Sequence, residues 1–215
     1  MGNRGILHNE DQQLITQKWR HKTWVTCALR HTDKKGQSWH RKIMQPGNYT
    51  ELFFLDEATA LSAGHRPCAL CRRENYNKFR QALGDHYSSA KALDEILHAE
   101  RTRLIEQKSS TTPPYPKYAL KDLPDGVIIL RSSLLENDLS NAPDPPIDWF
   151  KNGPWLKNGG FLMGWTHNGY QNRIHATDEY VRVLTPETII KALKGGYKPV
   201  IHPSGTPHPR SQNHQ

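Results

Sequence analysis

The sequence predicts an α+β fold, in which a helical, cysteine-bearing N-terminal part precedes a smaller β-rich C-terminal segment. Three observations favour this class. Apolar residues recur at helical spacing between residues 73 and 107, whereas short alternating apolar runs bounded by Gly and Asn follow residue 126. Cys68 and Cys71 form a C-x-x-C motif directly behind a Gly-His-Arg-Pro turn. A chain of 215 residues is long enough for one domain with a buried core, or for a domain with a small appendage.

The N-terminal part begins with two predicted strands, at residues 17–30 and 51–55, where apolar side chains alternate or cluster. Asp56 fits the N-cap of a short helix, because its side chain can accept a hydrogen bond from a free backbone N–H, and Gly64 fits the position after that helix. A further helix is predicted to follow the C-x-x-C and to end near Gly84.

Another helix is predicted over residues 88–107. Its apolar stripe has heptad-like spacing and consists of Leu93, Leu97 and Leu104. Glu100 falls on the same stripe. A carboxylate on a face that points to the core needs a partner or a chemical role.

The C-terminal part predicts strands at 126–133 and 180–184 and a hairpin over 159–174, with its turn at Asn168-Gly169. A last helix is predicted to have Thr185 as N-cap and Pro186 as its first residue. The organisation expected from these elements is a basic domain at 1–108, a linker at 109–125, a β-rich segment with a terminal helix at 126–202 and a disordered tail at 203–215.

Positive charge is concentrated in the part of the chain that carries the cysteines. Residues 1–121 hold 20 Lys and Arg against 12 Asp and Glu, so they account for the whole net charge of +8. A segregated basic surface is typical of nucleic-acid binding, although it also occurs in merely soluble basic proteins. No stretch is apolar enough for a membrane span or a signal peptide, and three cysteines do not suggest a secreted disulfide scaffold. We therefore expect a cytoplasmic, monomeric protein with DNA as its partner and no membrane association.

The three cysteines predict a zinc site. Zinc prefers four soft or borderline ligands, often supplied as two close pairs. Cys68 and Cys71 give one pair, and Cys27 with His31 gives a C-x3-H pair. His40 and His65 are possible replacements for His31, and a redox dithiol or inert cysteines are the alternatives to a metal.

The stretch "ELFFLDEATALSAGHRPCALCRR" resembles the second half of the Ada-type zinc-binding domain found in bacterial alkylation-repair proteins. The matching positions are Phe53, Phe54, Ala63, Gly64, Arg66, Pro67, Cys68 and Cys71. The resemblance covers about 50 residues and is weaker in its first half, where the family has C-x3-C and this chain has Cys27 and His31. The chain as a whole also resembles a group of bacterial proteins, a resemblance that implies no activity.

The resemblance to the Ada-type domain implies a structural zinc ion and a surface that faces DNA. It assigns methyl transfer from a DNA phosphotriester to the position of Cys27, but His31 in place of a fourth cysteine would leave a less nucleophilic sulfur. We expect Arg66, Arg72 and Arg73 to meet phosphates, unless they are ordinary solvated side chains. Asn3 and Arg4 lie on a polar N-terminal arm that could enter a groove.

A zinc ion with four protein ligands has no open position at which to activate water, and the chain contains no phosphate-binding loop, dinucleotide fingerprint or H-E-x-x-H motif. Cleavage of an N-glycosidic bond needs only a carboxylate and a pocket for an extruded base. The sequence therefore predicts a DNA glycosylase for damaged or modified bases, acting in repair or in defence against foreign DNA. The candidate catalytic residues are Glu100, Glu51, Asp94, His98 and Asn3.

Two other functions remain open. The first is a DNA-binding or damage-sensing module without enzymatic activity, in which Glu100 is a structural ion-pair partner. The second is a metal-dependent nuclease that uses His167, Asn168 and His175 of the predicted hairpin. None of the three functions implies a small-molecule cofactor.

Overall fold

The computed structural model of the chain describes residues 1–32, 36, 38–39, 43–84, 87, 89–106, 115–131 and 153–206. Its α-helices are α1 (Glu57–Ser62), α2 (Arg73–Leu83), α3 (Ala90–Glu106) and α4 (Glu187–Lys194). Its strands are β1 (Gly2–Asn3), β2 (Val25–Thr26), β3 (His31–Thr32), β4 (Ser38–Trp39), β5 (Arg66–Pro67), β6 (Lys117–Ala119), β7 (Ile128–Arg131), β8 (Trp155–Asn158), β9 (Phe161–Thr166), β10 (Gly169–His175) and β11 (Tyr180–Val183). The predicted α+β class is confirmed. None of the described helices is both long and apolar enough to cross a membrane.

The larger sheet has the strand order β10-β9-β8-β7-β11-β6, and all of its neighbouring strands are antiparallel. Strands β7 to β10 form a meander, and β11 then returns along the other side of β7. The β9–β10 turn lies at His167 and Asn168, because Gly169 already pairs with Thr166. The predicted hairpin is thus confirmed, with its turn displaced by one residue.

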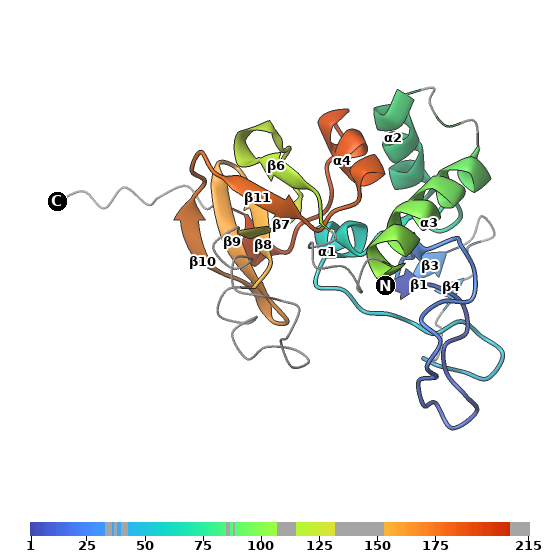
Figure 1. The fold of residues 1–215 in the computed structure, drawn as a ribbon. Helices are drawn as coiled ribbons and strands as arrows, with labels where there is room; N and C mark the ends of the chain where they lie inside the picture. The colour runs from blue at the N-terminus through green and yellow to red at the C-terminus, as the bar shows by residue number, and fades with distance from the viewer. Residues whose placement is uncertain are drawn as a thin grey trace.

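Helix α4 packs against α2 and α3, and in Figure 1 it lies between these helices and the sheet. One apolar core joins these helices to the large sheet. Phe79 of α2 and Leu93 and Leu97 of α3 are buried together with Ile129 of β7 and Ile189 of α4. The apolar stripe predicted for the helix over 88–107 is therefore a packing surface at Leu93 and Leu97, while the side chain of Leu104 lies outside the described residues.

The boundaries predicted between domains do not separate two cores. The core combines Leu61, Phe79 and Leu97 from the N-terminal part with Val181 and Leu193 from the C-terminal part. Lys117–Ala119, inside the predicted linker 109–125, forms β6 and pairs with β11. The β-rich segment at 126–202 does contain β7 to β11 and α4.

The N-terminal part contains a small three-stranded sheet of order β1-β2-β5, with β1 antiparallel and β5 parallel to β2. The strands predicted at 17–30 and 51–55 are wrong over most of their length. Only Val25–Thr26 of the first is a strand, and Leu52 of the second forms an isolated bridge with Gly2. In Figure 1 the chain between β1 and β2 runs as a long loop, which bonds back to the N-terminal arm through Arg20 N–H and Arg4 O, 2.9 Å apart.

The helix ends follow local chemistry. Asp56 Oδ1 accepts a hydrogen bond from Thr59 N at 2.8 Å, which confirms the predicted N-cap of α1. Gly84 follows α2 with a φ of +66°, a conformation that glycine adopts without a steric penalty. The N-cap predicted at Thr185 is wrong: Pro186 occupies that position, and Thr185 Oγ1 instead accepts from Ile128 N at 2.9 Å.

Candidate metal centre and a cationic cavity

The pairing of β2 with β5 brings two cysteines together. Val25 pairs with Arg66 and Thr26 with Pro67 in parallel register, and Cys27 and Cys68 are the residues that come next on each strand. Neighbouring strands lie about 5 Å apart, so these cysteines leave the sheet side by side. Cys71 returns to the same place through the turn closed by the hydrogen bond from Arg72 N to Cys68 O. The ligand atoms of Cys27, Cys68 and Cys71 all lie within 4.8 Å of one another.

Backbone N–H groups point at two of the three sulfur atoms. Ala28 N donates to Cys71 Sγ at 3.3 Å, and Leu70 N donates to Cys68 Sγ at 3.4 Å. Hydrogen bonds from Cys27 and Cys71 lower the pKa of Cys68, whereas the hydrogen bond with Cys68 raises the pKa of Cys27, so without a metal one thiolate is shared among the three sulfur atoms. Donors of this kind stabilise thiolates, the form in which cysteine binds a metal. The cluster therefore has the donor set and the surroundings of a thiolate metal site.

The fourth ligand is not defined by the described residues. His31 begins β3, four residues after Cys27, but its side chain lies outside them, as does the whole of His40. His65 is completely buried and its Nε2 accepts a hydrogen bond from Arg4 Nε at 3.2 Å, so it belongs to a different cluster.

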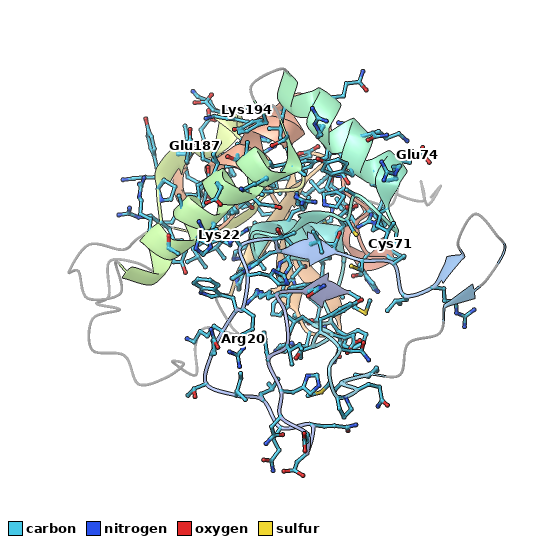
Figure 2. All side chains as sticks on the ribbon, turned by 90° about the vertical axis from the view of Figure 1, so that its right-hand side faces the viewer. Arg20, Lys22, Cys71, Glu74, Glu187 and Lys194 are labelled. Atoms are coloured by element: carbon cyan, nitrogen blue, oxygen red, sulfur yellow. The ribbon has the colours of Figure 1, made fainter. Side chains whose placement is uncertain are left out.

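A buried glutamate connects the cysteine turn to the rest of the fold. Glu57 of α1 is 5% exposed; its Oε1 pairs with Arg72 Nη1 at 2.9 Å and accepts from Tyr197 Oη at 2.7 Å. Its Oε2 accepts from Val200 N at 3.0 Å. Arg72 also donates to Thr26 Oγ1 at 2.7 Å. Figure 2 shows Cys71 directly below the start of α2, whose first turn carries Glu74.

The arginines predicted to meet phosphates differ in their surroundings. Arg66 is 3% exposed and donates through Nε and Nη2 to both carboxylate oxygens of Asp94, each at 2.7 Å, so it does not face solvent. Arg72 is held by Glu57. Arg73, at the start of α2, is exposed. Of these three side chains, Arg73 alone is free to reach a phosphate without breaking an ion pair.

Asp94 and His98 do not pair with each other. Asp94 accepts from Arg66 and, at 2.8 Å, from Thr23 Oγ1. The ring of His98 lies edge-on to Trp19, with 4.6 Å between the ring centroids. Burial, then the charge of Arg101, lowers the pKa of His98.

Glu100 bonds to the start of α4. Its Oε1 accepts from Thr188 Oγ1 at 2.7 Å and from Thr188 N at 3.1 Å. The carboxylate thus satisfies a backbone N–H in the first turn of a helix, where negative charge is favoured. Desolvation nevertheless raises the pKa of Glu100, against the hydrogen bonds from Thr188, which lower it.

Replacing Glu100 with glutamine should therefore be tolerated, since the amide oxygen can keep the bonds from Thr188. Glu100→Ala should cost about 0.5–2 kcal/mol, as the loss of a helix cap does.

The stability contributed by Glu100 should depend on pH. Because the pKa of Glu100 is higher in the folded chain than in the unfolded chain, this stability is present below the unfolded pKa and is lost as the pH rises through the folded pKa. Urea unfolding between pH 4 and 8 should show Glu100→Gln gaining stability relative to the wild type as the pH increases. A constant difference would contradict this assignment.

Glu51 lies in a cavity, unlike Asp94 and Glu100. It is 7% exposed, and its Oε2 accepts from Met44 N at 2.9 Å. The cavity has a volume of about 430 Å³. Its walls include Phe53, Phe54 and Arg4 beside Glu51. Of the carboxylates predicted to be catalytic, Glu51 is the one that a ligand could reach.

Asn3 and the hairpin histidines have local roles. Asn3 Oδ1 accepts from Gly5 N at 2.8 Å and so shapes the turn that follows β1. His175 packs on Phe161 at the end of β10 opposite to the turn that carries His167. At about 3.3 Å per residue along a strand, His167 and His175 are on the order of 20 Å apart, too far to bind one metal ion.

The second cavity of interest has a volume of about 460 Å³ and lies between the N-terminal part and the large sheet. It is lined by Arg4, Lys18, Trp24, Thr59, Ser62, Ala63, Gly64, Arg101, Tyr115, Ile128, Pro154, Trp165, Leu184 and Pro186. The guanidinium carbons of Arg4 and Arg101 lie 3.9 and 4.3 Å from the ring centroid of Trp24. Arg4 lines both cavities.

Sequence reasoning named Arg4 but missed Arg101, Trp24 and Trp165. The position of Arg101 directly after Glu100 in the predicted helix could have drawn attention to it. Its hydrogen-bond partner Lys22 is distant in sequence, so the sequence does not show that Arg101 is buried. Comparison with protein-family models, with curated proteins and with solved structures gave no match to this chain.

Proposed function

We propose that this chain is a DNA-acting zinc protein, a DNA glycosylase in which the metal is structural. The observation that carries the enzymatic part of the proposal is the position of Glu51, a buried carboxylate on the wall of a cavity that also presents Phe53, Phe54 and Arg4. Cleavage of the glycosidic bond of an extruded base requires a carboxylate beside an aromatic or apolar pocket, and the cation Arg4 could bind a neighbouring phosphate.

The proposal for the metal rests on three sulfur ligands in contact range of one ion. Three thiolates would favour zinc over the hard cations magnesium and calcium, and the N–H groups of Ala28 and Leu70 point at two of the sulfur atoms, those of Cys71 and Cys68. His31 is proposed as the fourth ligand, in line with the resemblance to the Ada-type domain. When bound, zinc would supply folding energy to the cysteine turn.

The chemical step assigned to Glu51 is hydrolysis. The bond between C1′ of the sugar and the base nitrogen breaks, and the electron pair leaves with the base, which takes up a proton. A water molecule adds its oxygen to C1′ and transfers a proton to the Glu51 carboxylate. Glu51 then releases this proton to the solvent, which supplies the proton that the departing base takes up, so the carboxylate is restored. The products are a free base and an abasic site. The negative charge of Glu51 also stabilises the oxocarbenium-like sugar that precedes attack by water.

A DNA-binding module without catalysis is the second candidate, and a specific observation favours it. Two of the three carboxylates predicted to be catalytic, Asp94 and Glu100, are occupied by Arg66 and Thr188. They therefore have structural partners that explain their burial. If Glu51 were also structural, holding Met44 N–H, the cavities would bind nucleic acid without cleaving it.

The test uses DNA that carries damaged or hypermodified bases, incubated with the protein in the presence of a chelator and then treated with hot alkali. A glycosylase releases a free base, detected by mass spectrometry, and breaks the strand only after alkali. Glu51→Gln keeps an acceptor for Met44 N–H and should reduce base release about 100-fold or more.

The matched control is Glu74→Gln, which changes an exposed glutamate that pairs with Lys78 on α2. It should release base at the wild-type rate. Full activity in Glu51→Gln would remove the catalytic assignment, and absence of abasic sites on every modified DNA would favour the binding module. Strand cleavage without alkali that stops when metal is removed would indicate a nuclease instead.

A further inference from the structure

Three cations, Arg4, Lys18 and Arg101, line the 460 Å³ cavity, and no Asp or Glu is among its lining residues. Arg101 is 5% exposed; its Nη1 donates to Gly64 O at 2.6 Å and its Nη2 to Lys22 O at 2.7 Å. These acceptors are neutral carbonyl groups. Its Nε is buried and has no hydrogen-bond partner among the described residues.

Arg4 adds a second guanidinium to the same wall. Its Nε donates to His65 Nε2, so that nitrogen carries no proton and His65 is the neutral tautomer. Burial, and then the charges of Arg4 and Arg101, hold the pKa of His65 well below its ordinary value. Within the described part of the chain, neither Arg4 nor Arg101 forms an ion pair with a carboxylate.

Desolvation of two neighbouring cations is costly. It lowers the pKa of both Arg4 and Arg101 to about 10. The ring of Trp24 compensates for part of this cost, since both guanidinium groups lie over it, but a cation–π contact contributes only about 0.5–2 kcal/mol. An anion in the cavity would stabilise both arginines, and Lys18, which also lines the cavity, is a third cation.

The lining that the large sheet and its flanking residues contribute is apolar and aromatic. Trp165 of β9 is held by the hydrogen bond from its Nε1 to Thr59 Oγ1 at 3.2 Å. Tyr115, Ile128 and Leu184 extend this wall. A volume of about 460 Å³ falls in the range of roughly 300–1,000 Å³ typical of small-molecule sites. The lining of the cavity therefore combines cations from the N-terminal part and α3 with apolar and aromatic side chains from the sheet.

We propose that this cavity binds a mononucleotide unit, with its phosphate against Arg4, Arg101 and Lys18 and its base against Trp165. A purely apolar ligand would leave the cations unmatched, and a metal ion would be repelled by them. The chemistry is the same for a free nucleotide and for one nucleotide of a DNA strand. The proposal does not depend on base cleavage, because Glu51 lies in the other cavity.

The experiment is isothermal titration of the full chain with deoxynucleoside monophosphates, the corresponding nucleosides, inorganic phosphate and a short single-stranded oligonucleotide. Nucleotide should bind more tightly than nucleoside or phosphate alone. Arg4→Gln or Lys18→Gln should weaken binding about 10- to 100-fold, as loss of a charge-assisted contact does. Trp165→Leu should also weaken nucleotide binding, while Trp165→Phe, which keeps an aromatic ring, should retain most of the wild-type affinity.

The matched control is Lys78→Gln, which changes an exposed cation on α2 that does not line the cavity and should leave the affinity unchanged. Tight binding of free monophosphates would identify free nucleotides as the ligand. Binding of the oligonucleotide alone, weakened by Lys18→Gln and Trp165→Leu, would identify a nucleotide within a strand. The proposal is overturned if neither ligand binds, or if Lys78→Gln weakens binding as much as the variants of the cavity do.

Discussion

Serine in place of Cys68 or Cys71 should release the metal and unfold the protein, because the N-terminal and C-terminal parts share one core. The turn that carries both cysteines lies between the two-residue strand β5 and helix α2, and Arg72 ties it to Glu57, so bound metal would add directly to the stability of this turn. Apparent binding free energies for structural zinc are about 10–16 kcal/mol in small domains, comparable to the whole stability of a folded protein. Elemental analysis and circular dichroism of the purified variants would measure both effects.

Leu70→Ala is the matched control for this prediction, since Leu70 stands between the two cysteines and is 69% exposed. It should keep the metal and the fold. Folded wild-type protein that contains no metal would refute the metal centre. Two further variants test the fourth ligand. His31→Ala should lose the metal; if His40→Ala loses it and His31→Ala keeps it, His40 is the fourth ligand instead.

The sequence predicted the helices well because their determinants are local. Asp56 caps α1, Gly84 follows α2, and the spacing of Leu93 and Leu97 gives the buried face of α3. It predicted the short strands poorly. β2 and β5 are two residues each, and their pairing joins segments about 40 residues apart, so no local periodicity reveals them.

In the candidate site, too, features set by local sequence were predictable, whereas contacts between distant segments were not. That Cys27 joins Cys68 and Cys71 was predictable, because metal ligands form recognisable spacings. That Arg66 is buried was not, because its partner Asp94 lies 28 residues further on, on a helix that the sequence places but does not orient. For Glu100 the sequence indicated a need for a partner, and Thr188, 88 residues away, supplies it.

Removal of the Asp94 carboxylate should greatly lower the free energy of unfolding. Asp94 and Arg66 have side chains 7% and 4% exposed and share two hydrogen bonds of 2.7 Å. Asp94→Ala would leave a buried guanidinium with its bond to Pro67 O as the remaining hydrogen bond described for it. Breaking a buried pair in this way costs about 3–5 kcal/mol, and urea unfolding would measure it.

The adjacent residue gives the control. Glu95 pairs with Lys22 at the surface, with side chains 46% and 49% exposed, so Glu95→Ala should leave the urea midpoint almost unchanged. Replacing both buried partners, as Arg66→Met with Asp94→Leu, should restore much of the stability lost in Asp94→Ala, because no unpaired charge remains. A catalytic Asp94 would behave differently: its variants would stay as stable as Glu95→Ala and lose base release. If Asp94→Ala is nearly as stable as the wild type, Asp94 becomes a candidate for catalysis again. If Asp94→Ala loses much of its stability and the double variant regains it, the carboxylate of Asp94 serves to hold α3 against β5.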